Sequence, residues 1–154
     1  MPTYVRNVKG TAWARLQDGD ASHEAVEQAV EDLLSFGDPS VFEANDCRDL
    51  EIIALARMAK RSAAKFEFLV IPPEQLTTLG IRTDKTDGDT LIPYANDRHY
   101  ELRAGRAELR RLVLDLSRPR PCILMIKPKM LKELAHKHTD IIEALQPDHW
   151  FFKP

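Results

Sequence analysis

The sequence has few cysteines, few glycines and no long apolar run, and each shortage excludes a class of protein. Its two cysteines, Cys47 and Cys122, are too few for a disulfide framework and lack the paired spacing of a zinc site or redox motif. We interpret both as buried, reduced thiols. The six glycines are scattered, and none recurs at the spacing of a P-loop or a dinucleotide-binding loop. The sequence therefore predicts no cofactor.

A membrane span needs roughly 18 or more consecutive apolar residues, and no window of the chain approaches that length. The N-terminus carries Arg6 and Lys9, but the apolar segment of a secretory signal peptide does not follow them. We therefore predict a cytoplasmic protein that does not bind a membrane.

The length and composition of the chain are those of a globular protein. Hydrophobic residues make up 44% and charged residues 30% of the 154 residues. A chain of this size buries about 70% of its unfolded surface, enough for one ordinary core. We therefore predict a single domain that spans residues 1–154.

Strand-like and helix-like segments follow one another along the chain. Apolar, β-branched and aromatic residues predict strands over residues 3–16, 40–44, 66–71, 90–94, 99–103 and 122–126. Apolar residues at helical spacing, with capping and breaking residues, predict helices over residues 22–36, 46–62, 73–79, 105–117 and 128–145. Residues 81–88 read as a polar loop, and residues 150–152 as a short strand or a docked tail.

The pattern Ile-x-Pro-x-x-Leu occurs at residues 71–76 and again at residues 126–131. In both places it is typical of a buried strand that turns directly into a helix beginning on proline. Strands followed closely by helices favour a sheet covered by helices. The predicted fold is α/β or α+β, with a mixed β-sheet of about five strands covered by three to five helices.

His136 and His138 resemble a metal-binding pair until they are placed on a helix. Residues two apart on a helix point to opposite sides, whereas helical metal pairs are three or four residues apart. His138 falls on the apolar side and His136 on the polar side. We expect one core and one surface histidine, and no metal site.

Charge is unevenly distributed although the net charge is only -2. Residues 18–51 contain eleven acidic residues against Arg48 alone, and residues 98–129 contain nine basic against three acidic residues. Arginine binds phosphate and carboxylate in a bidentate way, which suits RNA, DNA or an acidic protein surface. The alternative is that the two segments pack against each other within the fold. The candidate binding residues are Arg98, Arg103, Arg106, Arg110 and Arg111.

The densest group of acid, base and hydrogen-bonding side chains surrounds a predicted turn. His99, Tyr100 and Glu101 are the candidate catalytic residues there. On a strand, however, His99 and Glu101 face one way and Tyr100 the other, so the three cannot all converge on one substrate.

Two hypotheses of function remain open. The first is a non-enzymatic binding or regulatory module whose polarised charge engages a protein partner or its own copy, with nucleic acid as the alternative partner. The second is a small enzyme, a hydrolase or nucleic-acid-processing protein, that acts on an anionic substrate near His99 and the basic helix. The absence of a catalytic motif favours the first.

Overall fold

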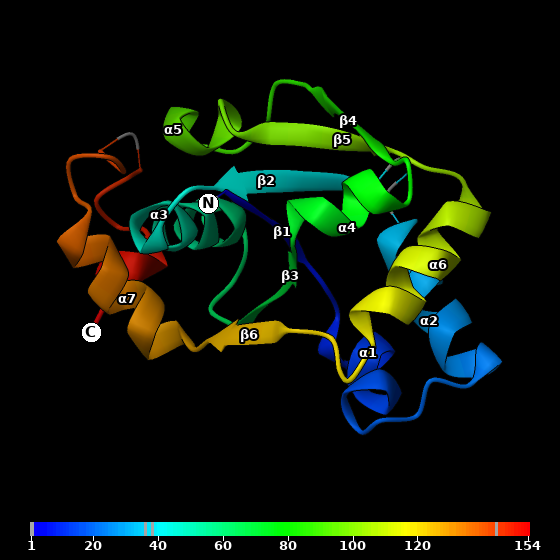
Figure 1. Cartoon of the computed structure of the whole chain (residues 1–154). Helices are drawn as coiled ribbons and strands as arrows, with labels where there is room; N and C mark the ends of the chain where they lie inside the picture. The colour runs from blue at the N-terminus through cyan, green and yellow to red at the C-terminus, as the bar shows by residue number, and fades with distance from the viewer. Residues whose placement is uncertain (1, 36, 38, 144) are drawn as a thin grey trace.

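The computed structural model describes residues 2–35, 37, 39–143 and 145–154. The strands are β1 (Thr3–Asn7), β2 (Ser40–Ala44), β3 (Phe66–Ile71), β4 (Arg82–Lys85), β5 (His99–Arg103) and β6 (Ile123–Ile126). They form one six-stranded sheet in the order β4-β5-β2-β1-β3-β6 (Figure 1). Every neighbouring pair is antiparallel.

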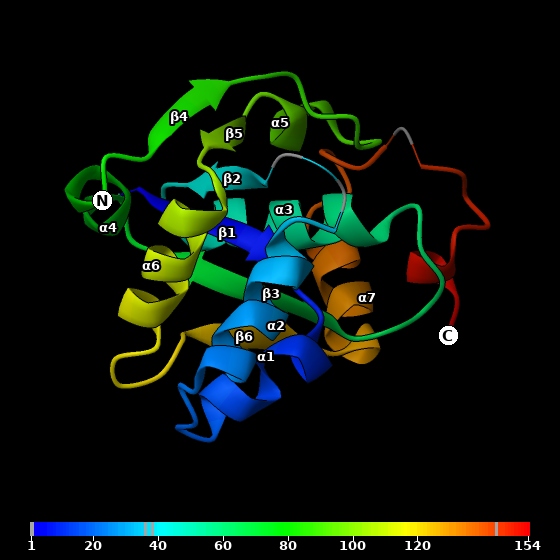
Figure 2. The same ribbon diagram turned by 90° about the vertical axis from the view of Figure 1, so that its right-hand side faces the viewer.

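Helices cover both faces of this sheet (Figures 1 and 2). They are α1 (Gly10–Gln17), α2 (His23–Leu33), α3 (Cys47–Met58), α4 (Pro73–Thr78), α5 (Pro93–Asn96), α6 (Arg106–Leu116) and α7 (Pro128–Lys137). Side chains alternate along each strand, so Phe66 and Phe68 of β3 pack on one core and Leu69 and Ile71 on the other. The first core is closed by α3 and α7, and the second by α1, α2 and α6.

The α+β alternative of the predicted fold class is confirmed, and six strands are close to the predicted five. The expected mixed sheet is wrong, and seven α-helices in the described residues exceed the expected three to five. The reason lies in the order of the strands. β2 and β3, joined by the single helix α3, do run in the same direction, but β1 lies between them and opposes both. Strands linked by one helix are therefore parallel without being neighbours.

Three local predictions are also corrected. Residues 3–16 form β1 and then α1, because Trp13 and Leu16 lie on one helical face and are buried in the core that α1, α2 and α6 close. Residues 81–88, expected as a loop, contain β4, which pairs with β5. Residues 90–94, expected as a strand beside β5, instead turn through hydrogen bonds from Thr90 to Asn96 and enter α5 at Pro93.

The chain end takes the second of its two expected forms, a docked tail, whereas the cysteines differ from expectation. Residues 150–152 form a 3-10 turn docked on the molecule rather than a strand. Cys47 and Cys122 are exposed, not buried, since Cys47 lies at the start of α3 and Cys122 just before β6. β6 is an edge strand with exposed side chains, not the doubly covered strand that its apolar sequence predicts. Among the described residues, none of the helices has both the length and the apolar character to span a membrane.

Candidate functional site

The acidic and basic segments contact each other where α2 and α6 lie side by side. Arg106 Nη1 lies 2.6 Å from Glu31 Oε1 and 3.3 Å from Glu27 Oε2. Arg110 also pairs with Glu27, and this hydrogen bond lowers the pKa of the Glu27 carboxyl. For Arg106 and Arg110 the charge asymmetry is therefore an internal attraction between two helices.

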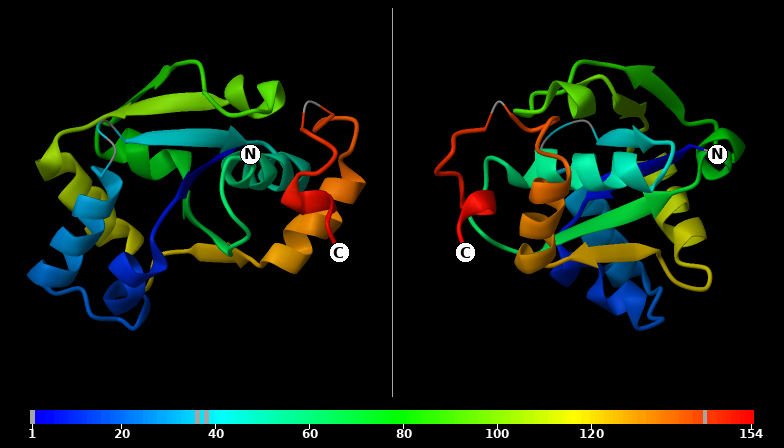
Figure 3. Two further views of the ribbon diagram at one scale, coloured as in Figure 1. Left: turned by 180° about the vertical axis from the view of Figure 1, so that it is seen from behind. Right: turned by 90° about the vertical axis from the view of Figure 1, so that its left-hand side faces the viewer.

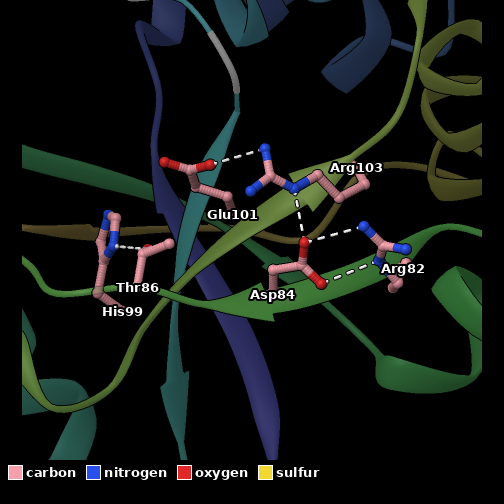
Figure 4. A network of polar contacts seen from close by, with 6 residues as sticks. All are labelled: Arg82, Asp84, Thr86, His99, Glu101 and Arg103. Carbon is pink, nitrogen blue, oxygen red and sulfur yellow. Dashed lines mark hydrogen bonds and ion pairs between the residues drawn. The ribbon is translucent and has the colours of Figure 1, made fainter.

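Arg103 belongs to a surface network on β4 and β5 (Figure 4). Its Nε lies 2.7 Å from Asp84 Oδ2 and its Nη1 lies 3.0 Å from Glu101 Oε2. Arg82 shares the same Asp84 carboxylate, with Nε 2.9 Å from Oδ1. This network joins the outer two strands of the sheet at their solvent-exposed side chains.

Arg98 and Arg111 lie in different surroundings. Arg98 Nε is 3.6 Å from Asp49 Oδ2, and its guanidinium stacks 3.8 Å above the centre of the Tyr94 ring. Arg111 is exposed, and it has no ion pair within the part of the chain that the structure describes. The five candidate arginines therefore do not converge on one ligand.

The three catalytic candidates separate as the strand alternation requires. His99 pairs with Phe42 and Glu101 with Ser40 across β5 and β2, so these side chains share the α3 face of the sheet. Tyr100 lies on the opposite face, in edge contact with Tyr4 at 5.7 Å between ring centres.

His99 and Glu101 line a cavity of about 570 Å³. The cavity is bounded by β1, β2 and β5, by the C-terminal end of α3 and by residues 87–89. Its lining carries four basic side chains, Arg6, Lys9, Arg57 and Arg61, and four acidic ones, Asp32, Asp87, Asp89 and Glu101. None of these basic residues belongs to the predicted binding set.

Arg57 is a half-buried cation in the last turn of α3. Burial lowers the pKa of its guanidinium and the charge of Arg61 lowers it further, while the charge of Asp89 partly offsets both. Its guanidinium lies 5.9 Å from the centre of the Phe42 ring, and within the described residues no carboxylate forms an ion pair with it. Arg57 remains charged at neutral pH, so its N–H donors are available to a ligand.

Arg6 reaches the same cavity from β1. Its Nη1 donates to the Ser40 carbonyl at 2.8 Å and its Nη2 to the Leu33 carbonyl at 2.9 Å. The buried Nε has no hydrogen-bond partner among the described residues. Burial lowers the pKa of Arg6 to about 10, which still leaves the side chain charged at neutral pH.

His99 lines the same cavity from β5. Its Nδ1 lies 2.7 Å from Thr86 Oγ1 (Figure 4). Burial lowers the pKa of His99 from its ordinary 6.5, so the ring is neutral at pH 7. Nowhere in the described residues do three His, Cys, Asp or Glu side chains gather as a metal site would require.

Sequence reasoning missed Arg6 and Arg57. In the predicted helix over residues 46–62, the helix dipole explains Arg57 and Arg61 equally well, whereas the observed α3 ends at Met58 and contains only Arg57. One cue was present, because Arg57 and Arg61 are one helical turn apart and so share a face. Arg6 lines the same cavity but lies on β1, far from Arg57 in the sequence, so no local pattern connects the two.

The cavity brings the charged side chains of Arg6 and Arg57 and the ring of His99 around one space, which suits a small molecule that carries an oxyanion. Its volume falls in the range of about 300–1,000 Å³ that small-molecule sites occupy. No protein-family model, curated protein or solved structure matches this chain.

Proposed function

We propose that this protein is a non-enzymatic binding module that holds a small molecule with one carboxylate or phosphate group in the cavity beside His99. One observation carries the proposal: Arg57 is a half-buried cation that makes no hydrogen bond or ion pair with a carboxylate in the described part of the chain, although the charge of Asp89 acts on it from beyond contact distance. A partly buried charge without a counter-ion in contact is costly in free energy, and a bound anion would lower that cost. Arg6 lines the same cavity and adds a second positive charge.

The acidic residues that line the cavity restrict the kind of ligand that it can bind. Asp87 and Asp89 line the wall, and their side chains make no ion pair within the described residues. They would repel a polyanion such as nucleic acid and attract a cationic or hydrogen-bonding group. The ligand that suits both the basic and the acidic residues of the lining is a small zwitterion or a polar monoanion.

Replacing Arg57 with glutamine is expected to weaken binding of such a ligand roughly 10- to 100-fold, since a charged hydrogen bond contributes about 1.5–3 kcal/mol. Calorimetric titration with inorganic phosphate, acetate, glycine and phosphoserine would measure this. The matched control is Arg111→Gln, which removes an exposed arginine remote from the cavity and should leave affinity unchanged. The proposal fails if none of the four probes binds saturably, or if the two variants lose affinity equally.

A second function, hydrolysis, is favoured by the state of His99. A neutral imidazole whose Nδ1 is held by Thr86 can accept a proton from water that attacks a bound ester. If so, the protein hydrolyses p-nitrophenyl acetate or p-nitrophenyl phosphate, and His99→Gln lowers kcat by about 100-fold or more. Tyr100→Phe is the control, because Tyr100 lies on the other face of the sheet. Equal losses in the two variants, or no turnover by the native protein, would refute hydrolysis.

We also propose a cytoplasmic location and a protein partner. Cys47 and Cys122 are both exposed, and exposed free thiols persist best where the compartment keeps them reduced. Protein is favoured over nucleic acid as the partner because Arg106 and Arg110, the arginines best suited to phosphate, already bind Glu27 and Glu31.

A further inference from the structure

The two edges of the sheet differ sharply in character. At one edge, β4 carries three charged residues in four, Arg82, Asp84 and Lys85, which is how natural edge strands avoid pairing with other chains. At the other edge lies β6 (Figures 1 and 3), and its sequence Ile-Leu-Met-Ile is uncharged. Leu124 is 43% exposed and Met125 is 48% exposed, and the two side chains point to opposite faces. The β6 edge is therefore apolar on both faces.

Cations flank this edge at both ends. Arg118 and Arg120 precede β6, and Lys127 and Lys129 follow it; all four side chains are exposed. None of them forms an ion pair within the described residues, in contrast to Arg106 and Arg110 of the same basic segment. The part of the charge asymmetry that the fold leaves unneutralised is thus concentrated around β6.

A shallow groove of about 340 Å³ lies beside the edge. Met125 and Met130 line it together with Lys127, Lys129 and Glu133, and Met130 is 50% exposed. Methionine side chains are flexible and polarisable, so such a groove can adapt to an aliphatic side chain.

We propose that the β6 edge binds an extended segment of another protein, apolar in its centre and acidic at both ends, which adds a seventh strand to the sheet. The outer backbone groups of β6 would supply the ladder hydrogen bonds, and the groove would receive one apolar side chain. The acidic ends would lie against Arg118 and Arg120 at one end and Lys127 and Lys129 at the other, whichever way the segment runs.

A second copy of the chain is a poorer occupant of this edge. Antiparallel pairing of β6 with itself would bring Lys127 and Lys129 of each copy toward Arg118 and Arg120 of the other. Like charges placed opposite each other are destabilising, so self-pairing meets repulsion at both ends. The same cations attract an acidic strand.

The test uses a seven-residue peptide with Val-Ile-Val between two acidic pairs, added to the isotopically labelled full chain. We expect saturable shifts of backbone amide resonances confined to residues 118–130 and weaker binding at higher salt. Met125→Lys should abolish the shifts. The matched control is Leu91→Lys, which changes another exposed apolar residue, 42% exposed, outside the sheet edge. A peptide with lysine in place of its acids should not bind.

Three outcomes would overturn this proposal. The first is the absence of saturable shifts with the acidic peptide. The second is a shift pattern centred on the cavity and removed by Arg57→Gln, which would assign the peptide to the proposed anion site. The third is a concentration-dependent dimer, detected by sedimentation and dissociated by Met125→Lys, which would make a second copy the occupant. Since β6 and the cavity share no lining residue, failure here leaves the proposed ligand site intact.

Discussion

Replacement of Asp49 by alanine is expected to lower the free energy of unfolding by about 3 kcal/mol, because it removes a buried carboxylate that accepts two hydrogen bonds and leaves the half-buried Arg98 without its counter-ion. The Asp49 side chain is almost fully buried at the start of α3. Its carboxylate accepts a hydrogen bond from the Tyr94 hydroxyl at 2.6 Å and another from the Asn45 amide at 2.8 Å. In the variant, Arg98 would keep the hydrogen bond from its Nη1 to the Tyr94 carbonyl, but its Nε would lose the counter-ion that lies 3.6 Å away in the native protein.

Asp49 also predicts how stability responds to acid. Burial opposes its ionisation, but the hydrogen bonds from Tyr94 and Asn45 and the charge of Arg98 outweigh burial and lower the pKa of Asp49 below 3.8. A carboxyl whose pKa is lowered by folding stabilises the native state above its unfolded pKa and ceases to do so as pH falls through its folded pKa. The native protein should therefore lose stability below about pH 4, and Asp49→Ala should lose less over the same range.

Urea unfolding of both proteins at neutral pH and at several acidic pH values would measure these effects. Asp140→Ala is the matched control, since Asp140 is an exposed acid with no ion pair among the described residues. We expect the control to change stability by about 0.5 kcal/mol or less. A loss for Asp49→Ala as small as that of the control would mean that the Asp49–Arg98 pair contributes nothing net to stability.

The parts of the fold that the sequence predicts well are those with local physical causes. The bounds of β2, β3 and β5 agree with prediction because each is a short run of strand-forming residues between turn or breaking residues. The start of α2 agrees because the Ser22 hydroxyl accepts a hydrogen bond from the Ala25 amide, as an N-cap does. Ile71 and Ile126 both end strands from which proline-led helices begin, as their repeated pattern predicts.

The parts that the sequence misses depend on contacts between distant segments. Trp13 favours a strand by propensity, yet it lies in α1 because its indole N–H reaches Asp32 of α2 at 2.9 Å. The insertion of β1 between β2 and β3 has no local cause in the sequence of β1. The sheet is therefore antiparallel because of how the strands pair in the folded protein, which no single segment of the sequence predicts.

In the candidate site, too, the sequence predicts what has a local cause and misses what depends on distant segments. Local chemistry alone drew attention to His99, and His99 does line the cavity. The cations that accompany it, Arg6 and Arg57, come from a strand and a helix that meet only in the fold. The predicted arginine row was open to two interpretations, a ligand or the acidic segment, and α2 lies against α6 in a way that occupies Arg106 and Arg110. Distant partners decide which charges remain available.

Replacement of Phe151 by alanine is expected to destabilise the protein by about 3–5 kcal/mol, the usual range for removing a fully buried aromatic ring. Phe151 is fully buried in the core between α3 and α7, at the centre of the docked 3-10 turn. Urea unfolding would measure the loss, with Phe152→Ala as the control. Phe152 is only partly buried, so its replacement should cost about 1 kcal/mol. Equal losses in the two variants would contradict the placement of Phe151 as the anchor.

The same turn is expected to influence the cavity, because it holds the end of the helix that carries Arg57. His149 Nε2 lies 2.6 Å from the Ala59 carbonyl, and the Trp150 indole N–H donates to the Arg61 carbonyl at 2.7 Å. The first bond occupies the carbonyl of Ala59, the C-cap residue of α3, and the second holds the segment that follows, so together they fix the end of the helix. If Phe151 anchors the turn, then Phe151→Ala should weaken phosphate binding under conditions where the variant is still folded, and Phe152→Ala should weaken it less. Unchanged binding in folded Phe151→Ala would show that the position of Arg57 is set by α3 alone.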